Sequence, residues 1–375
     1  MIRDPQSIWL DDLAHALGLA GVQAFLTEFE LKPFRLKQIY RAANKELLGS
    51  IGEVTTLPKE LRETLEARGF SFSSVEPVVV QRSNDAQTTK GLFRLHDGNE
   101  VEAVLMEHRG DRTTVCISSQ AGCAFACAFC STGQAGFTRN LNAREIFDQA
   151  RFFARELAAR GKRITNVVFM GMGEPFHNYE AVMGAVALLN DPHGLGLGHR
   201  HITISTVGLV EQIDRFADEG LQVNLAISLH APSDRIRASI MPVNRRYPLD
   251  ALMGACERYV AKTNRKVFFE YVMLEGVNDS PESARELAEL MRGKLYHVNL
   301  IPYNTTPDGA FAGTPDARIW EFAAILDAAS VPTTVRKNMG RDIAAACGQL
   351  RAETQPKAHM PPLSSRAHST GLRIN

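Results

Sequence analysis

Three cysteines stand within eight residues of this chain, Cys123, Cys127 and Cys130, in the spacing CxxxCxxC. Thiolates are common ligands of iron–sulfur clusters and of structural zinc, and both kinds of site usually take four protein ligands. Three thiolates would therefore leave one iron of a cluster open to a substrate or cofactor. The flanking residues 119–122 and 131–133 are small or polar and predict a loop, which could wrap a cluster.

Two plainer interpretations of these cysteines compete with a cluster. Free cysteine packs well in apolar cores, and three cysteines with one distant ligand could bind zinc. The close spacing in a Gly-flanked loop favours the cluster over both alternatives. Cys256 provides the contrast, because it shares a helical stripe with Leu249, Leu252 and Met253 and is interpreted as packing.

The elements that must position these thiols alternate between strand and helix. Strand patterns occur at Thr114–Ser118, Asn166–Met170, His201–Ser205, Gln222–Ser228, Lys266–Met273 and Tyr296–Ile301. Helical patterns follow near 143–158, 179–190, 209–219, 250–262, 280–292 and 316–329, and Thr333–Arg336 could add an edge strand. Such repeated units predict an α/β fold with a parallel sheet and right-handed crossovers. Six units predict a partial (β/α)6 barrel rather than a complete eight-unit barrel.

The flanking regions have other patterns. Residues 1–75 predict a small helical accessory domain, 76–108 a β linker with a hairpin, 109–350 the core, and 351–375 a flexible tail. A helix from Pro33 to about Leu48 carries a basic face formed by Arg35, Lys37, Arg41 and Lys45. This face is interpreted either as a solvated surface or as a phosphate-contacting one.

Composition indicates the class of protein and the compartment in which it acts. The chain has 375 residues and a formal net charge of zero, which speaks against overall basicity as the basis of nucleic-acid binding but allows a local patch. No apolar run approaches the ~20 residues that cross a bilayer, and the N-terminus has no signal-peptide core. Six cysteines, four of them between 116 and 130, do not resemble a disulfide framework. We therefore expect a cytoplasmic protein that does not enter a membrane.

Polar residues and glycines follow nearly every predicted strand. Gly171-Met-Gly-Glu-Pro175 follows the second strand, Ser205 ends the third, Ser228-Leu-His230 ends the fourth, and Asn304 follows the sixth. The carboxyl ends of parallel strands meet at one edge, where ligands bind. Glycine lets a backbone approach a ligand closely, and Glu174 could accept a hydrogen bond from an ammonium group.

The thiol spacing is also the cluster motif of the radical S-adenosylmethionine (SAM) superfamily. The longer runs Cys116-Ile-Ser-Ser-Gln-Ala-Gly-Cys123, Cys130-Ser-Thr-Gly and Gly136-Phe-Thr-Arg-Asn-Leu141 resemble the RlmN/Cfr family of RNA adenine methyltransferases. The resemblance extends to about residue 352 and implies a 4Fe-4S cluster on Cys123, Cys127 and Cys130. It also implies SAM contacts at Gly173, Glu174, Ser205, Ser228, Leu229, His230 and Asn304.

The resemblance further assigns the reacting groups. Cys347 is implied to carry a methyl group, Cys116 to be its resolving partner, and Glu102 to be the proton acceptor, in a segment 102–116 that is longer than in some relatives. Two SAM molecules are implied per turnover, one methylating Cys347 and one yielding a 5′-deoxyadenosyl radical that activates this methyl group. After the carbon attacks adenine, a transient Cys116–Cys347 disulfide releases the product.

The implied substrates are 23S rRNA, at the peptidyl-transferase centre, and the tRNA adenine that lies 3′ of the anticodon. An electron donor such as flavodoxin or ferredoxin and a monomeric state are also expected. Methylation at C2, as in RlmN, fits Gly173-Glu-Pro175, whereas Arg246-Tyr-Pro248 and Lys294-Leu-Tyr296 are reminiscent of Cfr, which methylates C8. A second alternative is a zinc-bound RNA-binding module without catalysis, which would neither absorb visible light nor cleave SAM.

Overall fold

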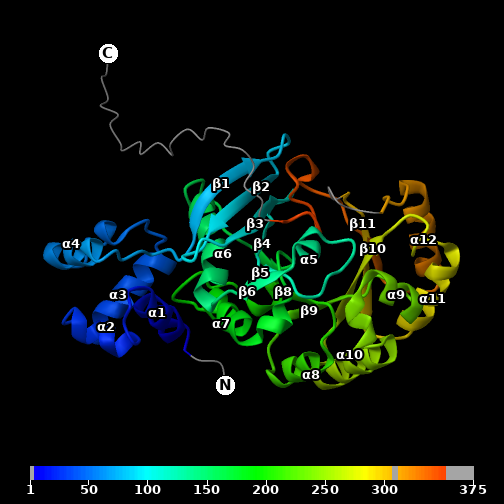
Figure 1. Ribbon diagram of the computed structural model, residues 1–375, viewed down its shortest axis with the longest axis horizontal. Helices are drawn as coiled ribbons and strands as arrows, with labels where there is room; N and C mark the ends of the chain where they lie inside the picture. The colour runs from blue at the N-terminus through cyan, green and yellow to red at the C-terminus, as the bar shows by residue number, and fades with distance from the viewer. Residues whose placement is uncertain (1–3, 306–310, 352–375) are drawn as a thin grey trace, which may run out of the picture.

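The computed structural model describes residues 4–305 and 311–351, and within them one large sheet dominates (Figure 1). Its strand order is β1-β2-β3-β4-β7-β8-β9-β10-β11-β12. All neighbours from β4 to β12 pair in parallel, whereas β1 to β4 pair antiparallel. The strands are β1 (Glu76–Arg82), β2 (Thr88–Arg94), β3 (Glu100–Glu107), β4 (Thr113–Cys116), β7 (Asn166–Phe169), β8 (Ile202–Thr206), β9 (Asn224–Ser228), β10 (Val267–Met273), β11 (Tyr296–Pro302) and β12 (Thr333–Val335).

Helices cover the outer face of the parallel part of the sheet (Figure 1). They are α6 (Ala143–Ala158), α7 (Tyr179–Asn190), α8 (Val210–Asp218), α9 (Asp234–Ile240), α10 (Leu249–Thr263), α11 (Pro281–Met291) and α12 (Asp316–Ala328). The α/β partial barrel expected from the sequence is therefore confirmed, including its edge strand β12. The short helix α9 was not expected, because its seven residues are too few to show a clear helical period.

Local sequence explains the longest of these helices. In α6, the Asn142 side chain accepts the backbone N–H of Glu145, whose carboxylate in turn accepts the N–H of Asn142. This capping box fixes the start of the helix. Ile146, Phe153 and other apolar residues at helical spacing then bury one face of α6 against the sheet.

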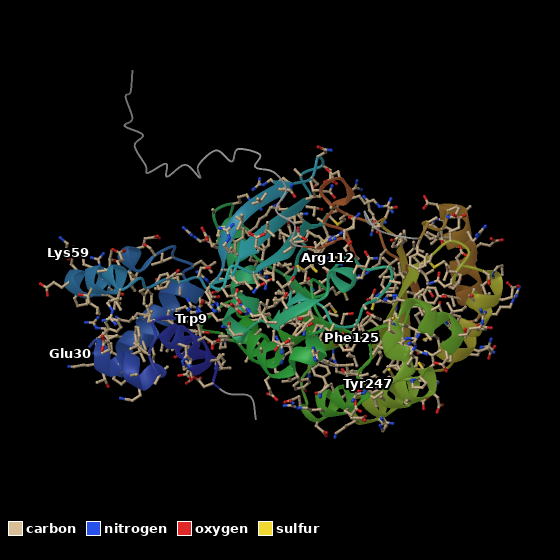
Figure 2. All side chains as sticks on the ribbon, viewed as in Figure 1. Trp9, Glu30, Lys59, Arg112, Phe125 and Tyr247 are labelled. Atoms are coloured by element: carbon tan, nitrogen blue, oxygen red, sulfur yellow. The ribbon has the colours of Figure 1, made fainter. Side chains whose placement is uncertain are left out.

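The N-terminal helices gather at one end of the molecule (Figure 1). They are α1 (Pro5–Ala16), α2 (Val22–Glu28), α3 (Pro33–Asn44) and α4 (Lys59–Ala67). Trp9, labelled in Figure 2, is fully buried, and the Arg144 guanidinium of α6 lies 4.9 Å from its ring centroid. The helix expected from Pro33 to about Leu48 ends earlier, at Asn44, and the chain turns where Leu47 adopts a φ of 56°.

The strands of the 76–108 region extend the core sheet. The expected hairpin is confirmed as β2 and β3, with Gly98 at a φ of 84° in its turn. β3 pairs antiparallel with β4 from Val104↔Cys116 to Glu107↔Thr113. Because this register is regular, the extra length of the 102–116 segment lies in the turn at residues 108–112. There the His108 N–H donates to the Arg112 carbonyl.

The segments on either side of the thiols are not the plain loop that the sequence predicts. Gln120–Gly122 forms β5, which pairs with β6 (Phe137–Asn140), and Ser131–Ala135 forms the short helix α5. The loop prediction was wrong here because tertiary contacts fix both elements. A Cβ on Gly122 would lie 2.0 Å from the Gly136 carbonyl oxygen, and the Ser131 N–H donates to the Gly348 carbonyl.

Short 3₁₀ turns complete the described parts of the chain: η1 (Ile51–Glu53), η2 (Pro175–Asn178), η3 (His199–His201), η4 (Pro242–Arg245) and η5 (Arg341–Ile343). Within the ranges that the structure describes, no helix has the length and apolar character needed to cross a membrane. The predicted flexible tail lies outside the described residues, apart from Arg351.

Candidate active site

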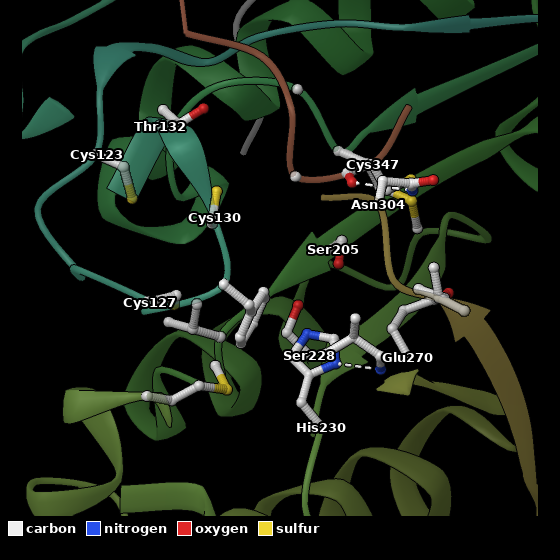
Figure 3. Close-up of a pocket in the computed structure, with 18 of the residues that line it drawn as sticks. Cys123, Cys127, Cys130, Thr132, Ser205, Ser228, His230, Glu270, Asn304 and Cys347 are labelled. Carbon is white, nitrogen blue, oxygen red and sulfur yellow. Dashed lines mark hydrogen bonds between the residues drawn. The ribbon is translucent and has the colours of Figure 1, made fainter. Parts of the chain in front are cut away.

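A cavity of about 160 Å³ opens at the carboxyl ends of the parallel strands. Figure 3 shows the three thiols of the cysteine loop on one side of this cavity and side chains of the strand ends on the other. Most of the predicted site residues line it: Cys123, Cys127, Cys130, Gly173, Glu174, Ser205, Ser228, His230, Asn304 and Cys347. We call this space the SAM cavity.

The cysteine loop offers a donor set that fits an iron–sulfur cluster. Cys127 is buried, and Cys123 and Cys130 are partly buried at the cavity wall. Among residues 4–305 and 311–351, no three His, Cys, Asp or Glu side chains gather closely enough for a single metal ion. Three soft thiol donors spaced around a cavity instead suit a cluster of several irons. Burial raises the pKa of the Cys123 thiol to about 12. A bound metal would favour the thiolate, because the thiolate is the form that ligates it.

Two neighbouring residues after β7 are held tightly. Gly173 has a φ of 98°, and a Cβ there would lie 2.5 Å from the Gln120 Cβ. The Glu174 carboxylate accepts the backbone N–H groups of Phe176 at 3.0 Å and Val207 at 2.8 Å. Burial raises its pKa to about 7 despite these hydrogen bonds. A carboxylate accepts about four hydrogen bonds, so Glu174 retains capacity for an ammonium group in the cavity.

The end of β9 presents polar groups of defined orientation. His230 adopts a φ of 58°, and its Nδ1 accepts the Val272 N–H at 3.0 Å. Burial lowers the pKa of His230 to about 3, so its ring stays neutral and has Nε2–H as its only donor. The side chain of Leu229, another predicted SAM contact, is fully buried in the core and does not line the cavity. Its role toward SAM stays a prediction.

The buried Arg237 of α9 fixes these strand ends from behind. Its guanidinium donates to the carbonyls of Val207 at 2.7 Å, Leu229 at 3.1 Å and Ser228 at 3.2 Å. Burial lowers its pKa to about 10. The side chain therefore joins the carboxyl ends of β8 and β9, which carry two predicted SAM-contacting residues, Ser205 and Ser228.

Cys347 reaches the cavity on a loop from the far end of the chain. The Asn304 amide donates to the Cys347 carbonyl at 3.3 Å (Figure 3). Its oxygen accepts from Arg341 Nε at 2.8 Å. Cys347 is exposed as a residue, but burial around its thiol raises the pKa, and the nearby Arg336 guanidinium opposes this effect.

A second cavity, of about 730 Å³, meets the SAM cavity at Cys347. Cys116 lines this second cavity together with Cys347, so the structure brings the two predicted reacting thiols to one space. Cys116 is buried, which raises the pKa of its thiol to about 12. We call this second cavity the basic cavity, because His108, Arg109, Arg112, Arg336 and Lys337 line it.

All six cysteines are free, and Cys256 is buried in α10 as expected of a packing residue.

Glu102 lies outside both cavities. It is buried, its carboxylate pairs with Lys90 Nζ at 3.0 Å, and its Oε2 accepts the Arg351 N–H at 2.9 Å. Two charged residues that the sequence analysis missed do face the SAM cavity. Glu270 of β10 pairs with Arg336 at 3.5 Å, and Arg336 lines both cavities. A charge inside the apolar run Val267–Met273 was the signal that could have revealed Glu270.

A parallel partial barrel with three thiols at its carboxyl edge has the architecture of radical SAM enzymes, and residues 117–289 match the Radical SAM superfamily. A probable dual-specificity RNA methyltransferase RlmN from Chloroflexus aurantiacus is 47% identical over 93% of this chain and 93% of that protein. Its namesake from Geobacillus kaustophilus is 44% identical over 90% and 92%. The crystal structure of a radical SAM methyltransferase from Sphaerobacter thermophilus matches with a TM-score of 0.86 and 48% identity, covering 92% of this chain and 99% of that one.

The chain belongs to the RlmN family of radical SAM methyltransferases.

Proposed function

We propose that this protein methylates C2 of adenine in 23S rRNA and in tRNA through a methyl group carried on Cys347. One observation carries the proposal: Cys347 stands where the SAM cavity meets the basic cavity that contains Cys116. A methyl carrier needs access to both a methyl donor and an acceptor base, and this position offers both. The relatives are named dual-specificity RNA methyltransferases, which supports the two RNA substrates.

The chain's own residues divide the work between binding and transfer. Cys123, Cys127 and Cys130 would hold the cluster, while Glu174, Ser205, Ser228 and Asn304 orient SAM. The cluster and SAM would together supply a 5′-deoxyadenosyl radical, which ordinary side chains cannot provide. Cys347 Sγ first accepts a methyl group and releases its thiol proton, and the second SAM-dependent step activates that methyl group.

Cys116 acts at the end of the cycle. Its thiol gives up its proton, its sulfur attacks Cys347 Sγ, the bond between that sulfur and the transferred carbon breaks, and a disulfide forms. The pair of electrons from the broken bond stays with the carbon, which takes up a proton and so completes the methyl group on the base, whose ring has already lost its C2 proton. A later two-electron reduction by a cellular thiol returns both cysteines to the free state in which the structure has them.

Basic side chains support RNA as the ligand of the second cavity. Arg109, Arg112 and Lys337 line it, and Arg112 is labelled in Figure 2. The net charge of the whole chain is zero, so these residues form a local patch, which attracts phosphate groups. On the N-terminal helices, exposed Phe34 and the Arg35 guanidinium 4.7 Å from its ring add a second candidate RNA contact.

Methylation at C8 instead of C2 is the alternative within the same chemistry. The names of the relatives favour C2. We further propose two SAM molecules per turnover, an electron donor such as flavodoxin or ferredoxin, a monomer, and a cytoplasmic setting.

The decisive experiment is anaerobic reconstitution with iron and sulfide, followed by incubation with SAM, reductant and unmodified rRNA. We expect 5′-deoxyadenosine, a methyl group on the Cys347 peptide and 2-methyladenosine in digested RNA, all detected by mass spectrometry. Cys347→Ala should yield no methylated RNA, whereas Cys256→Ala, which changes a buried thiol that lines neither cavity, should retain activity. Methylated RNA from Cys347→Ala would overturn the proposal, and 8-methyladenosine from the wild type would move the target to C8.

A further inference from the structure

The segment that carries Cys347 connects distant parts of the sheet. β12 ends at Val335, and residues 340–351, which we call the Cys347 segment, return to the strands β2 and β3 near the opposite edge. The Asn84 N–H, in the β1–β2 turn, donates to the Asp342 carboxylate at 2.7 Å. Gly340 packs so closely on β2 that a Cβ there would lie 2.7 Å from Thr88 Cγ2.

A buried ion pair holds this segment on both sides of Cys347. Lys90 of β2 and Glu102 of β3 meet at 3.0 Å, with side chains only 10% and 6% exposed. Lys90 Nζ lies 3.4 Å from the Ala344 carbonyl, three residues before the cysteine. Glu102 Oε2 accepts the Arg351 N–H at 2.9 Å, four residues after it. The two charges neutralise each other, and each also hydrogen-bonds the Cys347 segment.

Neither side chain of the ion pair lines a cavity. Lys90 and Glu102 are absent from the walls of both the SAM cavity and the basic cavity, although both cavities include Cys347. An acceptor of the substrate proton must come within hydrogen-bond reach of that proton. The Glu102 carboxylate is instead engaged by an ammonium group and a backbone N–H, which fix its orientation.

We propose that the Lys90–Glu102 pair is a positioning device that holds the Cys347 segment in place for methyl transfer. Glu102 then acts on the reaction through this segment rather than by accepting a proton from the base. The inference rests on the proposed function of Cys347 as methyl carrier. The inference also gives β2 and β3 a role in the chemistry. These strands lie outside the parallel barrel, but they hold the segment that carries Cys347.

The test distinguishes positioning of the Cys347 segment from proton acceptance by Glu102. It follows the methylation of Cys347, a step that involves no substrate proton. Reconstituted holoenzyme receives SAM and reductant without RNA, and mass spectrometry follows the methylation of Cys347. Hydrogen exchange of the 344–351 peptide reports the order of the segment. The variants are Lys90→Met, which leaves the Glu102 carboxylate in place, and Glu102→Gln. Lys162→Met is the control, because Lys162 pairs with Glu107 of the same strand at 2.7 Å and has no contact with the Cys347 segment.

We expect Lys90→Met and Glu102→Gln each to slow Cys347 methylation by about tenfold to a hundredfold, the effect of a misplacement of about 1 Å. Both should speed exchange at 344–351, while Lys162→Met behaves as wild type. If a single variant fails to fold because it strands a buried charge, Lys90→Met/Glu102→Gln removes both charges and should show the same slowing.

Normal Cys347 methylation in both variants, with RNA methylation lost in Glu102→Gln alone, would overturn positioning and make Glu102 the proton acceptor. Wild-type enzyme that never methylates Cys347 would refute the proposed function instead. The exchange data would then still test whether the ion pair orders the segment.

Discussion

The variant Gly173→Ala tests how the close packing around Gly173 affects both the stability of the fold and the binding of SAM. The new Cβ would meet Gln120 Cβ at 2.5 Å, Gln120 Cγ at 2.7 Å and the Gln120 backbone N at 2.9 Å. Rotation of the Gln120 side chain cannot remove the last of these contacts. Gln120 also accepts the Glu174 N–H at 2.8 Å, so a shift of Gln120 displaces Glu174. The clash therefore spreads to the group expected to bind the SAM ammonium.

The free energy of unfolding should fall through two additive effects. Left-handed backbone costs an L-residue about 1–2 kcal/mol, and overpacking costs about 1–3 kcal/mol. The loss of unfolded-state entropy offsets about 0.4–1 kcal/mol. Gly161→Ala is the matched control, since Gly161 has a φ of 68° and a Cβ added there would have no other atom within 4 Å. The difference between the two variants isolates the overpacking cost of about 1–3 kcal/mol.

Two measurements check this reasoning. Thermal unfolding should place Gly173→Ala below Gly161→Ala by roughly 2–6 °C, given about 2 °C per kcal/mol in a long chain. Anaerobic equilibrium dialysis should show SAM affinity reduced roughly 5- to 150-fold in Gly173→Ala, if SAM binding loses the same 1–3 kcal/mol, which corresponds to about 0.7–2.2 powers of ten. Gly161→Ala should bind SAM as the wild type does. Equal melting temperatures and equal SAM affinities of the two variants would refute the argument.

Three further outcomes follow from the site. Changing any one of the three cysteines of the CxxxCxxC loop to Ala should abolish the brown colour and SAM cleavage, and a full iron complement in the triple variant would contradict the cluster assignment. Cys116→Ala should still methylate Cys347 but accumulate RNA-linked protein, visible as nuclease-sensitive slow migration on a denaturing gel; normal migration with normal 2-methyladenosine would rule out a resolving role. The pKa of Glu174, raised from 4.5 to about 7, means that folding favours its protonated form, so its contribution to stability is present below pH 4.5 and is lost as the pH rises through about 7. Denaturant titrations should show this loss of stability in the wild type and not in Glu174→Gln. SAM affinity should rise over the same pH range only if the ionised Glu174 carboxylate binds the SAM ammonium group.

Local sequence was sufficient for much of the fold. The strand and helix patterns from 114 to 329 are confirmed because each combines a clear period with turn residues, and the capping box of α6 is a local signal of the same kind. The rule that ligands bind at carboxyl ends of parallel strands correctly predicted that Ser205, Ser228 and Asn304 line one cavity. The segments beside the thiols were mispredicted because β5 forms only by pairing with β6 across the cysteine loop, and the first residue of α5 donates to Gly348, far along the chain.

Other parts of the site have no local signature. Leu229 was grouped with its neighbours, but its side chain, directly after the end of β9, is fully buried in the core. Arg336 lies next to the reacting thiols only because β12 pairs with β11 and ends beside the SAM cavity. The contact between Glu102 and Arg351 joins residues far apart in sequence, and no periodic pattern encodes such a pairing.

The open form of the barrel explains why the proposed methyl carrier comes from the end of the chain. The parallel strands run from β4 to β12 without closing on themselves, so the two ends of the sheet stay apart. Residues that leave β12 must cross this opening to reach β2 and β3, and their path passes Asn304, the cysteine loop and Lys90. A cysteine in this crossing faces the SAM cavity on one side and the basic cavity on the other. A closed barrel would bury that position, whereas the incomplete one leaves Cys347 at the wall of both cavities, as its proposed role of methyl carrier requires.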